Sequence, residues 1–541
     1  MRARPFLAAV LAVALVLLSL GLAGWWLVWQ RSPLQLAHQP LRQPLAARFV
    51  PRQAPFSLHL LAAPDTLVGY ARAVAPARQR RQAAENLDRL RDGAFAAAGL
   101  DYVNELAPWL GDETSLALFG AGDRAAGAGA GADGAGGWLL ALRSRDPEGA
   151  RRFLQRFWQT RSLAGTDLQI SSYRGMGLIS GRGALVGQES VPLATALVND
   201  DLVLLASGRG VLEQALDVSQ IDELNQAGQP RFRRAIAELE QGTALISARP
   251  GALAGRLGLA AAAAADPRLQ ELVAVIRPEG RALAVQGLLS LRQPLPALQL
   301  SGAEALLDAL RGDPASLALL ANPAAILGQA EPQTPAAAEA MPLASLLRAA
   351  LAAEAGPLPA LVAAADGGPL LWARQAQGWL LASRSGDPQP EAVASALQAQ
   401  GFGAAPLQAE GQTLQVWTRL QSAPQRGDPD QLQVSLAGAR FEQGPLAWWG
   451  EGLAVLEQQR ESRQQPRQRR EQLAALNSPT AAFQWAMGAK PARKLLAAWQ
   501  PWRLLGALAG GLPSEAVDGL ALSVEVDPAG ALRLRGRLEL A

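Results

Sequence analysis

The stretch that decides the fold occurs twice in the chain. GWLLALRSRDPEGARRFLQRFW begins at Gly137, and GWLLASRSGDPQPEAVASALQ begins at Gly378. Trp138 therefore corresponds to Trp379, at an interval a little under half of the 541 residues. A chain that repeats itself at half its own length is most simply a tandem of two copies of one domain.

An Asp-Pro pair follows the apolar run in both copies, as Asp146-Pro147 and as Asp387-Pro388. An N-cap aspartate accepts free backbone N–H groups and a proline at the first position fixes φ, so a helix is predicted after each pair. One apolar stripe along the first of these helices is formed by Ala150, Phe153, Leu154, Phe157 and Trp158. A catalytic role for Asp146 is the weaker interpretation, because no second acidic residue recurs at a fixed spacing.

The rest of each copy alternates short strands with helices. FSLHLLAAP (56–64) and ASLALLANP (315–323) each predict a strand and then a proline-marked turn into a helix. TALVNDDLVLLAS (195–207) predicts two strands around an Asn-Asp turn. Apolar helices are predicted over 251–276 and 492–511, and both copies end in a strand. Each copy is thus predicted to be an α+β domain, an antiparallel sheet with helices mainly on one face.

A glycine-rich stretch, GAGAGADGAGG, lies between two predicted strands of the first copy, TSLALF and GWLLALRS. A phosphate-binding loop closes a strand and opens a helix, whose N-terminal amides meet the phosphate. Here the stretch joins two strands, and in the second copy the matching strands are joined only by RQAQ, Arg374 to Gln377. A flexible insertion is favoured over a phosphate site.

The N-terminus predicts a membrane anchor. Residues 1–5 contain Arg2 and Arg4 and are assigned to the cytoplasm, while the uncharged residues 6–29 are long enough to cross a bilayer. A cleaved signal peptide is the alternative, but cleavage near Gly24 would leave WWLVW at a soluble N-terminus. The following residues are assigned to the periplasmic or lumenal side, so that the chain is a single-pass protein of a plasma or thylakoid membrane.

Domain limits follow from these patterns. Residues 30–55 are rich in Pro, Gln and Arg without an apolar period, which predicts an extended tether. The first α+β domain is assigned to residues 56–302 and the second to residues 303–541.

Composition narrows the function. The chain has no cysteine, so thiolate catalysis and thiolate metal sites are excluded. Its only histidines, His38 and His59, lie in different segments, which argues against a metal site or a catalytic triad built on histidine. A formal net charge of +3 is small for this length and argues against a nucleic-acid-binding surface spread over the whole protein. No catalytic, cofactor-binding or metal-binding residue is therefore assigned, and no cofactor is expected.

Two basic stretches need an explanation. QQRESRQQPRQRRE (458–471) is interpreted as a solvated connection, because no aromatic residues interleave with the arginines, as they would in a nucleic-acid arm. Binding of this stretch to anionic lipid is a further possibility. Residues 489–511 combine both lysines of the chain with Trp499 and Trp502. This mixture suits a helix in a membrane interface, although an ordinary domain helix is the favoured interpretation.

Taken together, the single anchor, PLAARFVPRQAPFSLHLLAAPDTL after it, the Asp-Pro-capped helices and VNDDLVLLASGRGVLEQAL resemble an uncharacterised family. It is the largely cyanobacterial, membrane-anchored family called domain of unknown function three-three-five-two. The resemblance covers roughly residues 44 to 541. It implies a membrane protein facing the periplasm or thylakoid lumen, and it supplies no catalytic residues.

Three functions are open at this stage. The first is a non-catalytic binding or scaffold protein, held in the lipid bilayer through residues 6–29, that binds a protein partner. The second is a carrier of a lipid or another apolar ligand between sheet and helices. The third and weakest is an unusual carboxylate hydrolase, because acidic residues such as Asp112 and Glu113 cannot be paired from sequence and recognised catalytic motifs are absent.

Overall fold

The computed structural model describes residues 32–120, 136–163, 168–184, 190–259, 261–327, 341–342, 348, 361–362, 365, 368–386, 390–409, 412–422, 432–511, 514–527 and 530–541. The predicted anchor (6–29), most of the glycine-rich stretch and the Asp387-Pro388 cap lie outside these residues. Among the residues described, no helix combines the length and hydropathy needed to cross a membrane.

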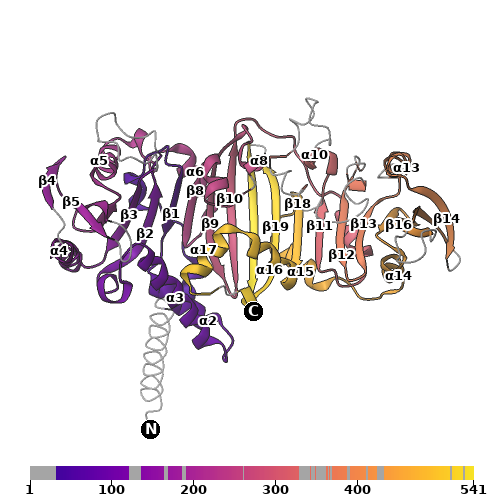
Figure 1. Cartoon of the computed structure of the whole chain (residues 1–541), viewed down its shortest axis with the longest axis horizontal. Helices are drawn as coiled ribbons and strands as arrows, with labels where there is room; N and C mark the ends of the chain where they lie inside the picture. Colours follow the sequence, from indigo (N-terminus) through magenta and orange to yellow (C-terminus); the bar gives the residue numbers. More distant parts are fainter. Residues whose placement is uncertain are drawn as a thin grey trace, which may run out of the picture.

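The described strands form one antiparallel sheet (Figure 1). Those of the first half are β1 (Phe56–Leu60), β2 (Leu110–Leu118), β3 (Trp138–Ser144), β4 (Gln169–Tyr173), β5 (Met176–Ala184), β6 (Ser190–Val198), β7 (Leu202–Ala206), β8 (Ala244–Ala248), β9 (Leu269–Glu279) and β10 (Ala282–Leu291). Those of the second half are β11 (Ser316–Leu320), β12 (Leu370–Gln375), β13 (Gly378–Arg384), β14 (Gly403–Ala409), β15 (Gln412–Ser422), β16 (Leu432–Gln443), β17 (Leu446–Gly450), β18 (Ala481–Gly488), β19 (Val517–Asp527) and β20 (Ala531–Leu540).

The pairing order is the same in the two halves. From the outer edge inward, the first half runs β4-β5-β6-β7-β3-β2-β1-β8-β9-β10. The second half runs β14-β15-β16-β17-β13-β12-β11-β18-β19-β20. The halves meet where β10 pairs with β20, with Gln286 opposite Arg535. The expected antiparallel sheets are therefore present, and they are continuous with each other.

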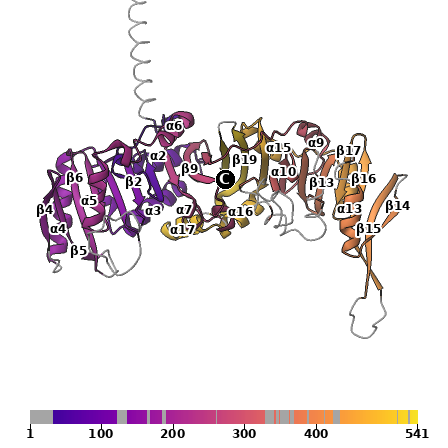
Figure 2. The same ribbon diagram turned by 90° about the horizontal axis from the view of Figure 1, so that it is seen from above.

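Helices cover both faces of this sheet, so the expectation of helices mainly on one face is wrong (Figure 2). On β12, Leu370 and Trp372 belong to one core cluster, while Leu371 and Ala373 belong to another. The physical reason is that strands such as β7, β11 and β17 are buried at every position. A strand that is apolar on both sides must be covered on both sides.

The helices divide between the two faces in each half. One face carries α5 (Arg209–Val218) and α6 (Pro230–Leu239) in the first half, and α9 (Ala303–Ala309), α14 (Leu453–Glu461) and α15 (Arg467–Ala475) in the second. The other face carries α4 (Pro147–Leu163), α7 (Pro250–Gly255), α8 (Ala261–Ala264), α10 (Pro323–Leu327), α13 (Pro390–Ala399), α16 (Ala489–Ala498) and α17 (Gln500–Leu508). At the lower edge in Figure 1 lie α2 (Pro64–Val74) and α3 (Arg80–Ala97).

Several local predictions are confirmed. A strand and then a proline-started helix follow one another as β1 and α2, and again as β11 and α10. The turn between β6 and β7 has Asn199 and Asp200 at φ of 49° and 62°, the left-handed region that a tight hairpin requires. The predicted helix over 492–511 is present as α16 and α17.

The helix predicted over 251–276 is wrong beyond its first turns. Only α7 and α8 are helical, and β9 begins at Leu269. Within β9, Val273 and Val275 pack under α6 on one face, while Leu272 faces the opposite core. This period of two, together with the β-branched valines, stabilises a strand more than the helix suggested by the alanines before it.

The expected extended tether over 30–55 is also wrong for the residues described, 32–55. They form two short 3₁₀ helices, η1 (Pro33–His38) and η2 (Leu45–Phe49). Two of its leucines, Leu34 and Leu45, are exposed at 43% each. Six other apolar side chains of the segment are buried: Leu36, Ala46, Ala47, Phe49, Val50 and Ala54. We call residues 32–54 the N-terminal junction, because they join the predicted anchor to the sheet.

Candidate functional site

Asp146 is a helix cap, as predicted. Its Oδ1 accepts a hydrogen bond from the backbone N–H of Glu148 at 3.2 Å, and Pro147 begins α4. The apolar stripe on this helix is buried beside Trp109 and Leu142. An added Cβ on Gly149 would lie 2.6 Å from both Asp146 Oδ2 and Trp109 Cβ. The capping carboxylate and the core tryptophan therefore both pack against Gly149. Asp146 also pairs with Arg152 of the same helix at 3.4 Å, so its side-chain contacts are those of a helix N-terminus.

Replacing Asp146 with alanine is expected to lower the free energy of unfolding by about 1 kcal/mol, the usual cost of removing an N-cap. Asn at the same position retains an acceptor and should restore most of this loss. Chemical denaturation of the three proteins measures the effect. An unchanged midpoint for the alanine variant would contradict the capping role.

Asp112 and Glu113 are adjacent on β2 but face opposite sides. Asp112 is half exposed and forms ion pairs with Arg42 at 2.6 Å and with Arg143 at 3.2 Å. Burial alone would raise the pKa of Asp112, but the hydrogen bond and charge of Arg42, with the charge of Arg143, hold it below its ordinary value. The two carboxylates do not form a shared acid–base site, because Glu113 points into the protein.

Glu113 fixes the N-terminal junction. Its side chain is 1% exposed, and its two oxygens accept the backbone N–H groups of Ala46 at 2.9 Å and Leu45 at 3.1 Å. These N–H groups lie at the start of η2, whose preceding residue, Pro44, makes no side-chain cap. Burial raises the pKa of Glu113 above its ordinary value, and the two N–H groups oppose this rise. A side chain 67 positions away from Ala46 thus caps η2, the second short helix of the junction.

Backbone hydrogen bonds tie the remainder of the junction to the first half. Leu41 N–H donates to Glu240 O at 2.7 Å, and Arg52 N–H donates to Leu224 O at 2.8 Å. Val50 O accepts from Gln226 N–H at 2.8 Å. Arg48 Nε donates to Ser219 O at 3.0 Å. The junction is therefore hydrogen-bonded to the first half along most of its length.

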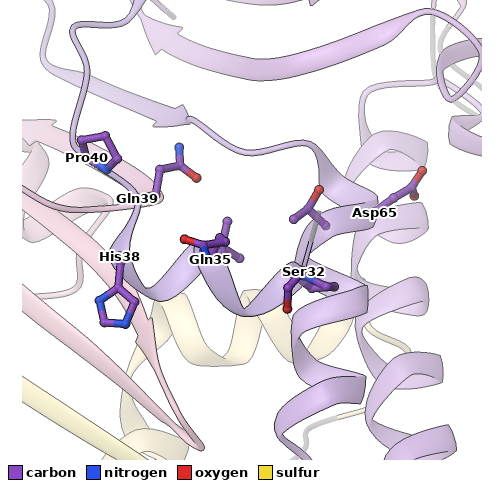
Figure 3. Close-up of a pocket in the computed structure, with 9 residues that line it drawn as sticks. Ser32, Gln35, His38, Gln39, Pro40 and Asp65 are labelled. Carbon is purple, nitrogen blue, oxygen red and sulfur yellow. The ribbon is translucent and has the colours of Figure 1, made fainter. Parts of the chain in front are cut away.

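A shallow hollow of about 600 Å³ lies on the junction, between η1 and the start of α2 (Figure 3). Its lining comprises Ser32, Pro33, Gln35, Leu36, His38, Gln39, Pro40, Asp65 and Thr66. Ser32 caps η1 by accepting the N–H of Leu34 at 3.3 Å, and Asp65 pairs with Arg91 at 2.9 Å. The hollow is open to solvent, and its lining combines apolar and neutral polar side chains with one carboxylate, that of Asp65.

His59, the other histidine, lies at the centre of a buried polar cluster. Its Nδ1 is 2.8 Å from Ser115 Oγ, and its Nε2 is 3.1 Å from Ser57 Oγ and 3.2 Å from Gln226 Oε1. Burial lowers the pKa of His59 to about 4, although the hydrogen bond with Gln226 acts in the opposite direction. All members of the cluster are buried, so their polar groups are satisfied by one another inside the protein.

Buried tryptophans whose indole N–H groups lack an acceptor distinguish the second half from the first. Trp417 and Trp449 stack with ring centroids 5.2 Å apart, and Trp372 lies 6.2 Å from Trp485. Within the described part of the chain, seven buried indole N–H groups have no hydrogen-bond acceptor: those of Trp372, Trp379, Trp417, Trp448, Trp449, Trp485 and Trp502. In the first half, Trp109 donates to Glu105 O at 2.7 Å and Trp158 donates to Thr195 Oγ1 at 2.7 Å. Buried N–H groups without a partner are costly and call for an explanation.

The sequence did not predict which residues contact Glu113 and His59. The repeat placed Asp146 correctly, but the capping role of Glu113 and the contacts of His59 depend on partners far away in the chain. In the described residues, no cluster of His, Asp or Glu could hold a metal ion.

The continuous antiparallel sheet covered by helices on both faces places the protein in the α+β class. The chain belongs to the family described as "Protein of unknown function (DUF3352)", whose model matches residues 10–439. No curated protein matches the chain.

Two solved structures give distant alignments. "Structure of crystal form I of TP0453" aligns with a TM-score of 0.26 and 11% identity, covering 47% of this chain and 81% of that one. "Structure of crystal form III of TP0453" aligns with a TM-score of 0.27 and 10% identity, covering 50% of this chain and 87% of that one. Similarity this low does not identify a shared function.

Proposed function

We propose that this protein is a membrane-anchored binding or scaffold protein without catalytic activity of its own. In this proposal residues 6–29 form a single membrane anchor, and the sheet with its helices lies on the periplasmic or lumenal side. The two halves are proposed to be homologous domains, which the shared strand order and the repeated GWLLA stretch support. The partner is a protein that binds the exposed surface of the sheet and helices.

The observation that carries the proposal is the fixed N-terminal junction. Only residues 30 and 31 separate the predicted anchor from Ser32, where η1 is already capped. Two residues span at most about 7 Å, too little for a flexible tether. A sheet coupled this closely to an anchor is held near one height and tilt above the bilayer, which suits a scaffold that positions a partner.

The test is to loosen this coupling. Twelve Gly and Ser residues inserted between Arg31 and Ser32 would give a flexible spacer of roughly 20 Å. We expect the variant to remain in the membrane fraction while crosslinking recovers less of the partner that the wild type retains. The matched control carries the same insertion between Gly129 and Ala130 of the glycine-rich stretch. Recovery of no protein partner by the wild type would contradict the scaffold proposal.

A second candidate function, a carrier of a lipid or another apolar ligand, is favoured by the tryptophan N–H groups of the second half. An apolar ligand that bears an acceptor oxygen would satisfy such donors inside an aromatic core. Native mass spectrometry and solvent extraction of the purified protein would detect a bound ligand. A protein free of ligand after purification from its own membranes would exclude the carrier.

A further inference from the structure

We propose that the outer surface of α16 and α17 lies on the bilayer and binds anionic lipid headgroups, as a second membrane contact in addition to the anchor. This inference rests on the proposed membrane anchoring and deepens it by naming a partner. We call the exposed side of residues 489–508 the α16–α17 surface.

The α16–α17 surface is both apolar and basic. Four large apolar side chains are exposed within eleven positions, at 41% for Leu495, 38% for Trp499, 55% for Leu504 and 43% for Leu505. Lys490, Lys494 and Arg503 are exposed among them, and the sequence from Ala489 to Gly511 contains no Asp or Glu. Exposed Leu and Trp beside basic side chains are typical of a helix that lies in a membrane interface.

The exposed leucines of this surface, Leu495, Leu504 and Leu505, belong to none of the core clusters of the described residues. The inner side of the helices is packed, with Ala492, Leu496 and Trp502 buried against β18 and β19. Arg493, the remaining basic residue, donates to Val517 O at 2.8 Å and to Glu515 O at 2.7 Å. Burying four exposed apolar side chains in lipid would therefore add free energy of binding without unpacking the domain.

The helices are also held in a defined position. Trp499 Nε1 donates to Leu257 O of the first half at 2.6 Å. An added Cβ on Gly93 of α3 would lie 1.9 Å from Leu508 O, so α17 packs closely on α3. These two contacts fix α16 and α17 against the first half of the chain.

The position of the surface agrees with a membrane contact. Helix α17 packs on α3, α3 on α2, and α2 on η1, where the described chain begins after the predicted anchor (Figure 1). The acidic residues of α3 are paired, Glu85 with Arg81 and both Asp88 and Asp92 with Arg91. Among the described residues, no carboxylate forms an ion pair with Lys490, Lys494 or Arg503, which leaves their charge for anionic lipid.

The experiment uses the full chain, which lacks cysteine and can be labelled at one chosen position. A nitroxide is attached through Leu504→Cys, or through Ala237→Cys on α6 as the control position, since both sites are exposed. Each protein is reconstituted into vesicles of phosphatidylcholine alone or of an equal mixture with phosphatidylglycerol. Collision with an aqueous nickel chelate should be about fivefold slower at position 504 than at position 237 in the anionic vesicles.

Charge-reversal variants test the lipid chemistry. The pair Lys490→Glu and Lys494→Glu is expected to abolish the protection of position 504. The matched pair Arg231→Glu and Arg233→Glu, which changes the charge of exposed α6 equally, should leave it intact. The inference is overturned if position 504 is as accessible as position 237 in the anionic vesicles. It is also overturned if protection is equal in neutral lipid and grows with protein concentration, which would indicate a second copy of the chain.

Flotation of the same vesicles separates this inference from the proposed function. A chain that floats with an exposed position 504 retains its anchor and lacks the second contact. A chain that does not float contradicts the anchoring itself.

Discussion

Replacing Glu113 with alanine is expected to lower the free energy of unfolding by about 3 kcal/mol, because two backbone N–H groups of the junction lose their charged acceptor. The junction between Pro44 and Val50 would also become a site of proteolysis, since η2 has no cap of its own. Denaturation midpoints and limited proteolysis measure the two effects. Glu113→Gln keeps one acceptor oxygen and should fall between wild type and the alanine variant.

The adjacent residue provides a matched control. Asp112→Ala removes a carboxylate from the same strand, but its ion pairs with Arg42 and Arg143 are solvent-exposed, so the loss should stay below about 1 kcal/mol. Equal losses for the two variants would contradict the specific role of Glu113. A stable Glu113→Ala protein with an intact junction would also weaken the proposed coupling of anchor to sheet.

The buried His59 should make the fold sensitive to acid. Its pKa is about 4 in the folded protein, and the unfolded chain has the ordinary histidine value of 6.5. Between these values the unfolded chain takes up a proton that the folded chain does not, so stability is full above about pH 6.5 and falls as the pH drops towards 4. Linkage predicts a loss of about 2 kcal/mol between pH 7.5 and pH 5 from this group.

Comparison with His59→Asn isolates this contribution. The variant lacks the titrating ring, so its free energy of unfolding should fall by about 2 kcal/mol less than that of wild type over the same pH range. His38→Asn is the control, because that ring is exposed on η1. Parallel pH profiles for wild type and His59→Asn would show that the buried ring does not couple to unfolding.

The sequence predicts the strands well because their apolar runs are short and bounded by turns. It also contains the reason for the second helical layer, since LLWA of β12 and WLLA of β13 are apolar on both faces. A half-exposed sheet would alternate apolar and polar residues along these strands. The continuity of the runs was the signal against helices on one face only.

The junction could not be predicted in the same way. Its conformation is fixed by hydrogen bonds to residues distant in the sequence, such as Glu113 and Gln226, and not by a local apolar period. A segment rich in Pro, Gln and Arg resembles a linker by composition, although its Leu36 and Phe49 are buried. The buried setting of His59 likewise depends on strand register, which places Ser115 opposite it on β2.

The pairing of β10 with β20 determines which strands lie at the two ends of the sheet. Because the same strand order runs outward from this central pair, the two edge strands, β4 and β14, are the corresponding strands of the two halves and face opposite ends (Figure 2). A partner that recognised a feature shared by both edges would find it twice on each chain. The chain would then be bivalent, and copies held in one membrane, as we propose, would be linked into rows by a bivalent partner, with avidity far above the affinity of either edge.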